Sequence, residues 1–159
     1  MHRSAVFSDC LQYRYSLKRG WSEQPEVIFV MLNPSIADVQ RDDPTIRRCI
    51  GLAQRNGFGG LEVVNWFAGR ATRPQTLFAM DDPVGPGNSD YLQQAFQSDR
   101  TVVVAWGAFE QARQAYEGYR SKHGVPKLQC LGCTKIGAPR HPLYVRNDVR
   151  WLPWTGYYD

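Results

Sequence analysis

Four short apolar runs rich in branched side chains constrain the fold of this chain more than any other feature. They cover residues 26–32 (EVIFVML), 61–66 (LEVVNW), 101–107 (TVVVAWG) and 127–132 (KLQCLG). Strands buried on both faces read as continuous apolar runs of this kind, and such strands are typical of parallel sheets. The alternation of these runs with helical patterns predicts an α/β fold with a mostly parallel central sheet, helices on both faces and right-handed crossovers.

Three helices with recognisable ends are expected between the strands. The first begins at Asp43-Pro44, an N-cap followed by proline at the first helical position, and ends at Gly57. The second begins at residue 88 or 89, and the third covers about residues 108–122. Each connection between successive parallel strands is therefore expected to contain a helix.

The two ends of the chain are expected to complete the sheet. Residues 5–8 and 12–19 alternate apolar and polar side chains around a break, which predicts a hairpin or edge strands. The aromatic tail predicts irregular structure or a last short strand. Residues 1–159 are therefore expected to form a single domain, a length at which one core buries most of its apolar surface.

Composition favours a cytoplasmic protein with no membrane partner. No apolar run approaches the roughly 20 residues that cross a bilayer, and the first 20 residues do not read as a secretory signal. The net charge is +4, and 15 of the 19 basic residues are arginine. Arginine presents a planar fork that suits phosphate, so this bias favours a nucleotide or nucleic-acid partner, whereas scattered surface charge explains it equally simply.

The expected strand exits carry unusual polar and aromatic groups. They lie at residues 32–35, 65–72, 105–107 and 137–144. Ligands of open α/β sheets bind outside the carboxyl ends of the strands, so the candidate site is placed there.

The first exit contains an Asn-Pro turn and leads to a helix N-terminus, a natural seat for an anion or a base edge. Asp43 is also explained as a helix cap. Asp38 has no capping role that the sequence reveals, and a carboxylate beside such a crevice can polarise a water molecule. We therefore predict Asp38 and Asn33 as catalytic residues, and the binding residues predicted at this exit are Pro34, Ser35, Asp43 and Thr45.

The other exits provide groups that suit a nucleobase. The carboxamide of Asn65 complements a base edge, and exposed aromatic rings stack on bases. His141 is a titratable imidazole in a rigid loop, and we predict that it is catalytic. The further binding residues predicted here are Asn65, Trp66, Phe67, Arg70, Trp106, Gly107, Arg140 and Pro142, although core packing is an equally simple role for the two tryptophans.

Cys130 and Cys133 have the spacing of half a metal knuckle or of a redox pair. No second closely spaced pair follows, so a closed zinc site would need ligands from distant parts of the chain. We therefore expect neither a metal nor a cofactor, and a thiol redox or metal protein remains a third hypothesis.

Four blocks of the sequence resemble, in order, those of the family called domain of unknown function 1643. The blocks are MLNPSIADVQRDDPTIRRC, GFGGLEVVNWFAGRAT, VVVAWG and GAPRHPLYV. That family is similar to the uracil-DNA-glycosylase-like superfamily, a three-layer α/β/α sandwich. The resemblance implies that residues 33–38 match its water-activating loop, that Asn65 lies on its base-reading strand, and that His141-Pro142-Leu143 match the motif whose histidine contacts the base.

Two functional hypotheses follow. The first is a glycosylase-like hydrolase that cleaves an N-glycosidic bond in nucleic acid or in a nucleotide. In it Asp38 or a neighbouring aspartate orients water, Asn65 reads the base and His141 donates a hydrogen bond to the leaving base. The phosphates would be held by Arg70, Arg73, Arg140 and Arg146. The alternative is a non-catalytic module that binds nucleotides or nucleic acid in the same crevice, and the sequence leaves the oligomeric state open.

Overall fold

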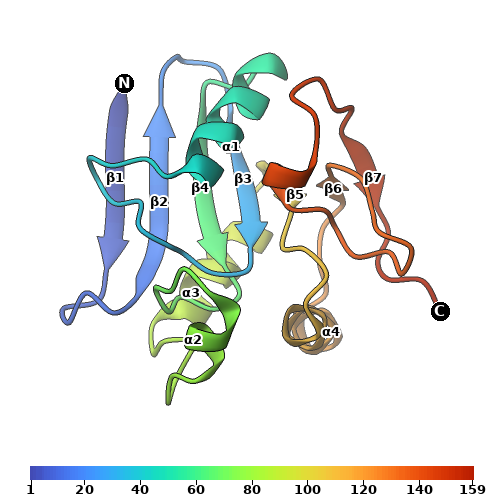
Figure 1. Cartoon of the computed structure of the whole chain (residues 1–159). Coiled ribbons are helices and arrows are strands. Elements are labelled where there is room, and N and C mark those ends of the chain that lie inside the picture. The colour runs from blue at the N-terminus through green and yellow to red at the C-terminus, as the bar shows by residue number, and fades with distance from the viewer.

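A seven-stranded sheet forms the centre of the fold in the computed structural model, which describes residues 1–159, and its order is β1-β2-β4-β3-β5-β6-β7 (Figure 1). The strands are β1 (His2–Phe7), β2 (Arg14–Gly20), β3 (Glu26–Met31), β4 (Gly60–Asn65), β5 (Thr101–Val104), β6 (Leu128–Cys130) and β7 (Leu152–Trp154). All four apolar runs become strands, as predicted.

The sheet is mixed. The four central strands β4, β3, β5 and β6 are parallel, whereas β1, β2 and β7 join them in antiparallel pairings. The predicted parallel pairing holds for the four central strands, whereas the sheet as a whole is mixed. The antiparallel margins arise because β1 and β2 form the predicted hairpin and because the tail turns back as β7.

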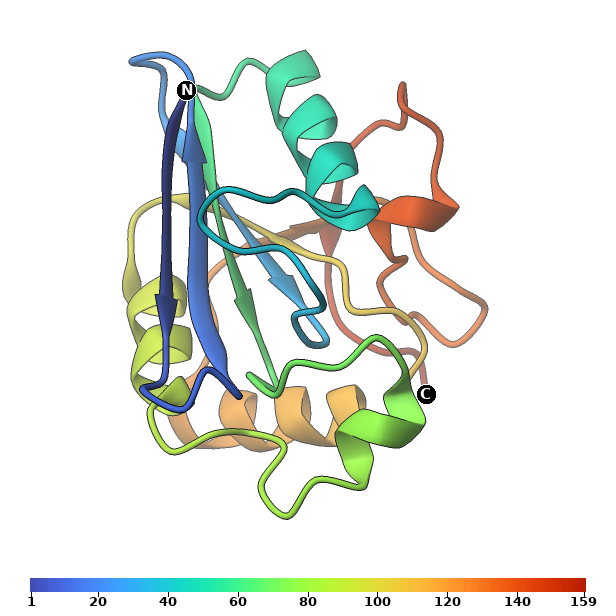
Figure 2. The same ribbon diagram turned by 60° about the vertical axis from the view of Figure 1, so that its left-hand side comes forward.

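Helices cover both faces of this sheet, as Figure 2 shows. The helices are α1 (Pro44–Arg55), α2 (Pro74–Phe78), α3 (Asn88–Gln97) and α4 (Glu110–His123), with a short 3-10 turn η1 (Pro142–Tyr144). The three predicted helices are confirmed: α1 and α4 agree within two residues at each end, and α3 begins at Asn88 as predicted. Helix α1 packs on one face, whereas α3 and α4 pack on the other. None of the helices combines the length and the apolar composition that a bilayer crossing requires.

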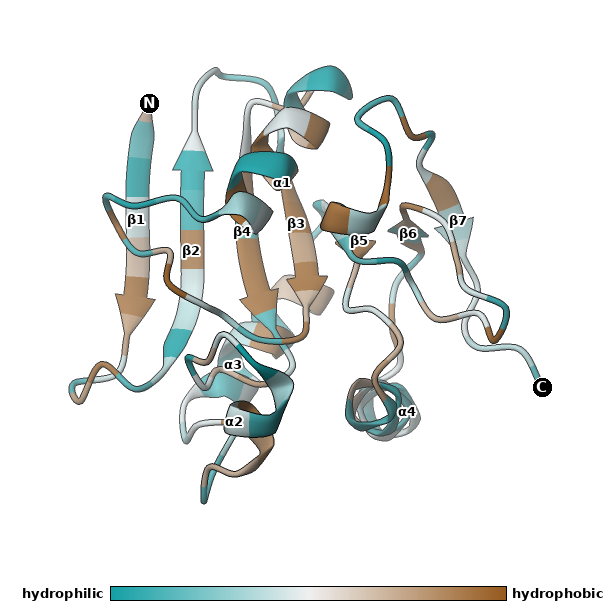
Figure 3. Ribbon diagram, viewed as in Figure 1, coloured by the Kyte–Doolittle hydropathy of each residue, from teal (hydrophilic) through white to brown (hydrophobic).

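The two faces carry different cores. Phe29 and Val63 of the sheet pack against Ile46 and Cys49 on the α1 face, where aliphatic side chains dominate. The core on the opposite face is richer in aromatic rings, which belong to Trp66, Phe67, Phe96, Trp106, Tyr116 and Trp154. Figure 3 shows the apolar colouring concentrated on β3 and β4, whereas β1 and most of β2 are more hydrophilic. The central parallel strands therefore form the buried part of the sheet.

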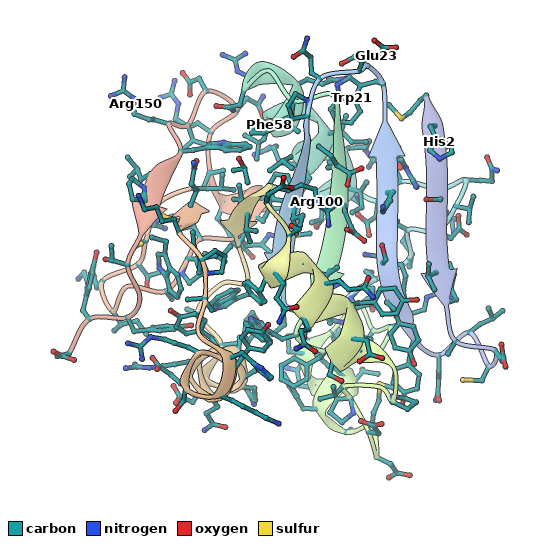
Figure 4. The ribbon with its side chains drawn as sticks, turned by 180° about the vertical axis from the view of Figure 1, so that it is seen from behind. His2, Trp21, Glu23, Phe58, Arg100 and Arg150 are labelled. Atoms are coloured by element: carbon teal, nitrogen blue, oxygen red, sulfur yellow. The ribbon has the colours of Figure 1, made fainter.

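The amino ends of the parallel strands are closed by aromatic packing. Trp21 donates its indole N–H to the carbonyl of Phe58 at 2.9 Å. Figure 4 shows Trp21 and Phe58 at the end of the sheet away from α4. On the same view lies Arg100, which pairs with the carboxylates of Glu26 and Glu62. The opposite end of the sheet, at the carboxyl ends of the parallel strands, is where a ligand site is expected.

A β-bulge in β2 changes which face its first residue occupies. Val6 pairs with Ser16 and Phe7 pairs with Arg14, so Tyr15 is the extra residue of the bulge. Tyr15 stacks on Tyr91 of α3. The bulge therefore frees Arg14 to reach the α1 face, where it donates a hydrogen bond to the carbonyl of Ala37.

Arg19, further along β2, ties the loop between β3 and α1 to the sheet. Its guanidinium is fully buried, and its Nε donates to Asp42 at 2.9 Å. Its Nη2 donates to the carbonyls of Asp38 and Arg41. One side chain thus satisfies three acceptors from a single loop.

Replacing Arg19 by methionine tests this role. The change removes a buried cation, leaves the Asp38 carbonyl without its side-chain donor and leaves Asp42 paired only with Arg3, so we expect the free energy of unfolding to fall by about 3 kcal/mol. Urea unfolding of the wild type and of Arg19→Met measures the difference. A loss below about 1 kcal/mol, the size typical of an exposed ion pair, would contradict the structural role.

Candidate functional site

A cavity of about 550 Å³ lies at the carboxyl ends of the central strands, on the side that α1 covers. Its walls come from the exit of β3, the first turn of α1, the exit of β5 and the loop that enters η1. Residues 71–74 close a further side. Segments that are far apart in the sequence therefore converge here, as the rule for open α/β sheets predicts.

Eight of the residues predicted from the sequence line this cavity. They are Asn33, Pro34, Ser35, Asp43, Thr45, Gly107, Arg140 and His141. Gly107 has φ of +81°, a conformation that favours glycine, and its N–H donates to the carbonyl of Pro139 at 2.8 Å. This bond ties the exit of β5 to the loop that carries His141.

Asn33 is used mainly to hold the walls of the cavity together. Its Nδ2 donates to the carbonyls of Pro34, Gly69 and Ala71 at 2.9–3.2 Å. The β3 exit is thereby fixed to the loop that follows β4. The donor group of Asn33 is thus committed, and only its Oδ1 is left to accept a hydrogen bond from a ligand.

His141 is positioned with a defined tautomer. Its Nδ1 accepts the backbone N–H of Leu143 at 3.1 Å, so a neutral ring carries its proton on Nε2. Burial lowers the pKa of His141, and the charge of Asp43 raises it in part. The loop itself is held against α1 because Arg48 donates to the carbonyls of Pro142 and Val145. The cavity therefore contains a neutral imidazole with a free N–H donor.

Asp43 serves the helix and the cavity at once. Its Oδ1 accepts the N–H of Ile46 at 2.9 Å, which confirms the predicted N-cap of α1. Its other oxygen makes no hydrogen bond inside the protein. The carboxylate lies close enough to His141 and to Arg14 that its charge raises the pKa of both.

Asp38, predicted as a catalytic carboxylate, does not line the cavity. Its Oδ1 accepts the backbone N–H groups of Gln40 and Arg41 at 2.9 and 2.8 Å. These hydrogen bonds lower the pKa of Asp38. Oδ1 of Asp38 therefore stabilises the conformation of its own loop, a role that the sequence did not reveal, and the carboxylate lies outside the cavity wall.

Several predicted binding residues lie in the interior instead. Trp66, Phe67 and Trp106 belong to the aromatic core on the α3 and α4 face, away from the cavity. Trp106 is fully buried, and its indole donates to the hydroxyl of Tyr157 at 2.8 Å. Asn65 is also buried, and neither atom of its carboxamide has a hydrogen-bond partner.

The remaining predicted residues are structural or peripheral. Arg70 donates to the carbonyl of Leu11 and lies over the ring of Phe7, outside the cavity wall. Pro142 is buried in η1 and does not line the cavity. Arg140 is exposed and lies on the cavity wall, where it makes no ion pair.

Sequence reasoning missed several wall residues. Phe109 and Tyr144 supply the aromatic rings of the cavity, and Tyr144 is 80% exposed. Tyr144 lies in the predicted exit at residues 137–144, so its position was a usable signal, whereas Phe109 falls just after the exit at 105–107, in the segment predicted as the third helix. Arg14 is the third, and nothing in the sequence marks it, because its orientation depends on the bulge in β2.

The cysteine pair lies beside the cavity without forming part of a metal cluster. Cys130 Sγ and Cys133 Sγ are 3.8 Å apart, and both thiols are free. Burial raises the pKa of Cys130 to about 11. No group of three or more His, Cys, Asp or Glu side chains has the arrangement of a metal site.

The lowered pKa of His141 predicts a pH dependence of stability. An unfolded chain binds the proton of this histidine more readily than the folded chain. The stability contributed by the neutral imidazole is fully present above the ordinary histidine pKa of 6.5 and should be lost as the pH falls from there through the lower pKa of the folded state. Between about pH 7.5 and pH 5, urea unfolding should show a larger loss for the wild type than for His141→Gln. Equal losses in the two proteins would contradict the burial of the imidazole.

Comparison with known proteins gives one match. No curated protein and no solved structure matches the chain. A sequence profile described as "Protein of unknown function (DUF1643)" matches residues 14–143, which include every segment of the cavity wall except Tyr144. The chain belongs to the DUF1643 family of proteins of unknown function.

Proposed function

We propose that the chain recognises a nucleotide or a base of nucleic acid in this cavity and hydrolyses its N-glycosidic bond. The observation that carries the proposal is that Asp43 and His141 both line this cavity. A carboxylate with one uncommitted oxygen and a neutral imidazole with a free N–H share the wall of one cavity. Groups of this kind suit the attack of water at one side of a bond and the stabilisation of a leaving group at the other.

The size and lining of the cavity support a ligand with a base. Its volume of about 550 Å³ falls in the range of small-molecule sites. Phe109 and Tyr144 offer rings on which a base could stack. The hydroxyl groups of Ser35, Thr45 and Thr72 make no hydrogen bonds inside the protein, so they are available to a polar ligand.

In the proposed reaction, Asp43 accepts a hydrogen bond from a water molecule whose oxygen attacks the anomeric carbon of the sugar. The bond from that carbon to the base nitrogen breaks, and its electron pair leaves with the base. His141 donates a hydrogen bond from Nε2 to the departing base, which becomes less basic as a result. The proton lost by the water passes to Asp43 and then to solvent or to the base, so the step is a net hydrolysis.

The layer arrangement is compatible with this chemistry. With α1 on one face and α3 and α4 on the other, we propose a three-layer α/β/α sandwich related to the uracil-DNA-glycosylase-like superfamily. Two of the proposed roles differ from those expected from the sequence. Asp43 takes the place of Asp38, which does not line the cavity, and Phe109 or Tyr144 takes the place of the buried rings of Trp66 and Trp106 as the stacking group.

Conservative substitutions of the two aspartates test the assignment. Asparagine is also a good N-cap, so Asp43→Asn should leave α1 intact while it removes the charge. We expect base release to fall about 100-fold or more in Asp43→Asn and by only a few-fold in Asp38→Asn. The assay measures free base released from oligonucleotides and nucleotides that carry a panel of damaged and modified bases.

The same assay decides between the enzyme and a binding module. Retained ligand binding together with lost turnover in Asp43→Asn supports hydrolysis. Absence of base release from every substrate by the wild type, combined with measurable binding of a nucleotide or of single-stranded nucleic acid, favours the non-catalytic alternative. Loss of release in Asp38→Asn instead would return the catalytic role to Asp38.

A further inference from the structure

Strand β2 carries two buried arginines that differ in their hydrogen bonding. Arg14 is 2% exposed and Arg19 is 0% exposed. The guanidinium of Arg19 is satisfied by Asp42 and by three backbone carbonyls. Arg14, in contrast, forms no ion pair and makes one side-chain hydrogen bond, from Nη1 to the carbonyl of Ala37 at 3.1 Å.

Arg14 lines the cavity and has donor atoms that the protein does not use. Its Nε is buried without a partner, and its Nη2 makes no hydrogen bond inside the protein. The residue lines the cavity together with Ser35 and Thr45. Buried polar groups are nearly always paired, and removing an ion from water costs several kcal/mol, so an unpaired buried guanidinium requires an explanation.

The charges around Arg14 do not supply that explanation. Asp43 is the one carboxylate that raises the pKa of Arg14, and it makes no ion pair with it. Arg19 and Arg70 act in the opposite direction, and burial is the largest cause of a pKa lowered to about 10. At neutral pH the guanidinium therefore stays charged, and its surroundings only partly compensate the charge.

A second unsatisfied group lies on the same side of the sheet. Both atoms of the Asn65 carboxamide are buried and without partners. Asn65 is aligned with Met31 on the neighbouring strand, and Met31 lines the cavity. Asn65 does not line the cavity itself, so its carboxamide is an unsatisfied polar group in the protein layer beneath Met31, whereas Arg14 is the unsatisfied group on the cavity wall.

We propose that Arg14 forms a subsite for an anionic group, a carboxylate or a phosphate, carried by the ligand of this cavity. The planar fork of an arginine fits either anion through two parallel hydrogen bonds. The inference rests on the proposed function and narrows it, because it requires a substrate whose acidic group enters the cavity. A neutral nucleoside would leave Arg14 unpaired.

Two stability measurements separate a ligand-binding arginine from a structural one. Without ligand, Arg14→Met should unfold at the same urea concentration as the wild type or at a higher one, because it removes an uncompensated buried charge. Arg19→Met, on the same strand and equally buried, should unfold at a lower concentration. If Arg14→Met is destabilised as much as Arg19→Met, or fails to fold, Arg14 is structural and the proposal is overturned.

A binding measurement completes the test. Inorganic phosphate and acetate are titrated separately at constant ionic strength, and thermal unfolding reports binding. We expect at least one anion to stabilise the wild type in a saturable way, and Arg14→Met to raise its dissociation constant at least about tenfold. Arg14→Lys should bind with intermediate affinity. Arg120→Met, which removes an exposed charge on α4, should bind like the wild type.

The identity of the stabilising anion distinguishes the two sources. A response to phosphate alone points to a nucleotide phosphate, and a response to acetate alone points to a carboxylate on the base or sugar. Equal affinity of wild type and Arg14→Met for both anions, or no binding by either protein, overturns the subsite. Since neither measurement uses base release, failure of the proposed hydrolysis would leave this result unaffected, and the converse also holds.

Discussion

The buried guanidinium of Arg19 is the interaction on which the geometry of the site depends. It holds the loop between β3 and α1 by donating to Asp42 and to the carbonyls of Asp38 and Arg41. That loop ends at Asp43, which caps α1 and lines the cavity. The position of the candidate catalytic carboxylate is therefore fixed by a residue of the neighbouring strand rather than by the loop itself.

The two buried arginines of β2 have different roles: Arg19 holds a loop through its hydrogen bonds, whereas Arg14 is proposed to bind a ligand. Removing a buried charge whose partners stay behind destabilises the fold, whereas a buried charge without partners itself lowers stability and is retained where a ligand completes it. The bulge at Tyr15 produces this difference, because it turns Arg14 onto the α1 face while Tyr15 stacks against α3. A local irregularity of the hairpin thus adds a cation to a cavity whose other walls come from the parallel strands.

The sequence predicted the elements and the location of the cavity, because both depend on local patterns. Continuous apolar runs identify the central strands, and the N-cap at Asp43 identifies the start of α1. Contacts between distant segments were not predictable. The bulge that orients Arg14 depends on how β1 pairs with β2. Trp66 and Trp106 are core residues because α3 and α4 pack on their face of the sheet. Asp38 accepts hydrogen bonds from backbone N–H groups of its own loop.

The central claim is that the cavity at the carboxyl ends of the strands is the ligand site. Titration of the ¹⁵N-labelled protein with a pyrimidine nucleoside 5′-monophosphate, followed by amide chemical shifts, tests it directly. The largest changes should occur at Thr45, Gly107 and Leu143, which line this cavity. Changes concentrated instead at Asn56 and Trp151, which line a separate cavity of about 520 Å³, would contradict the claim.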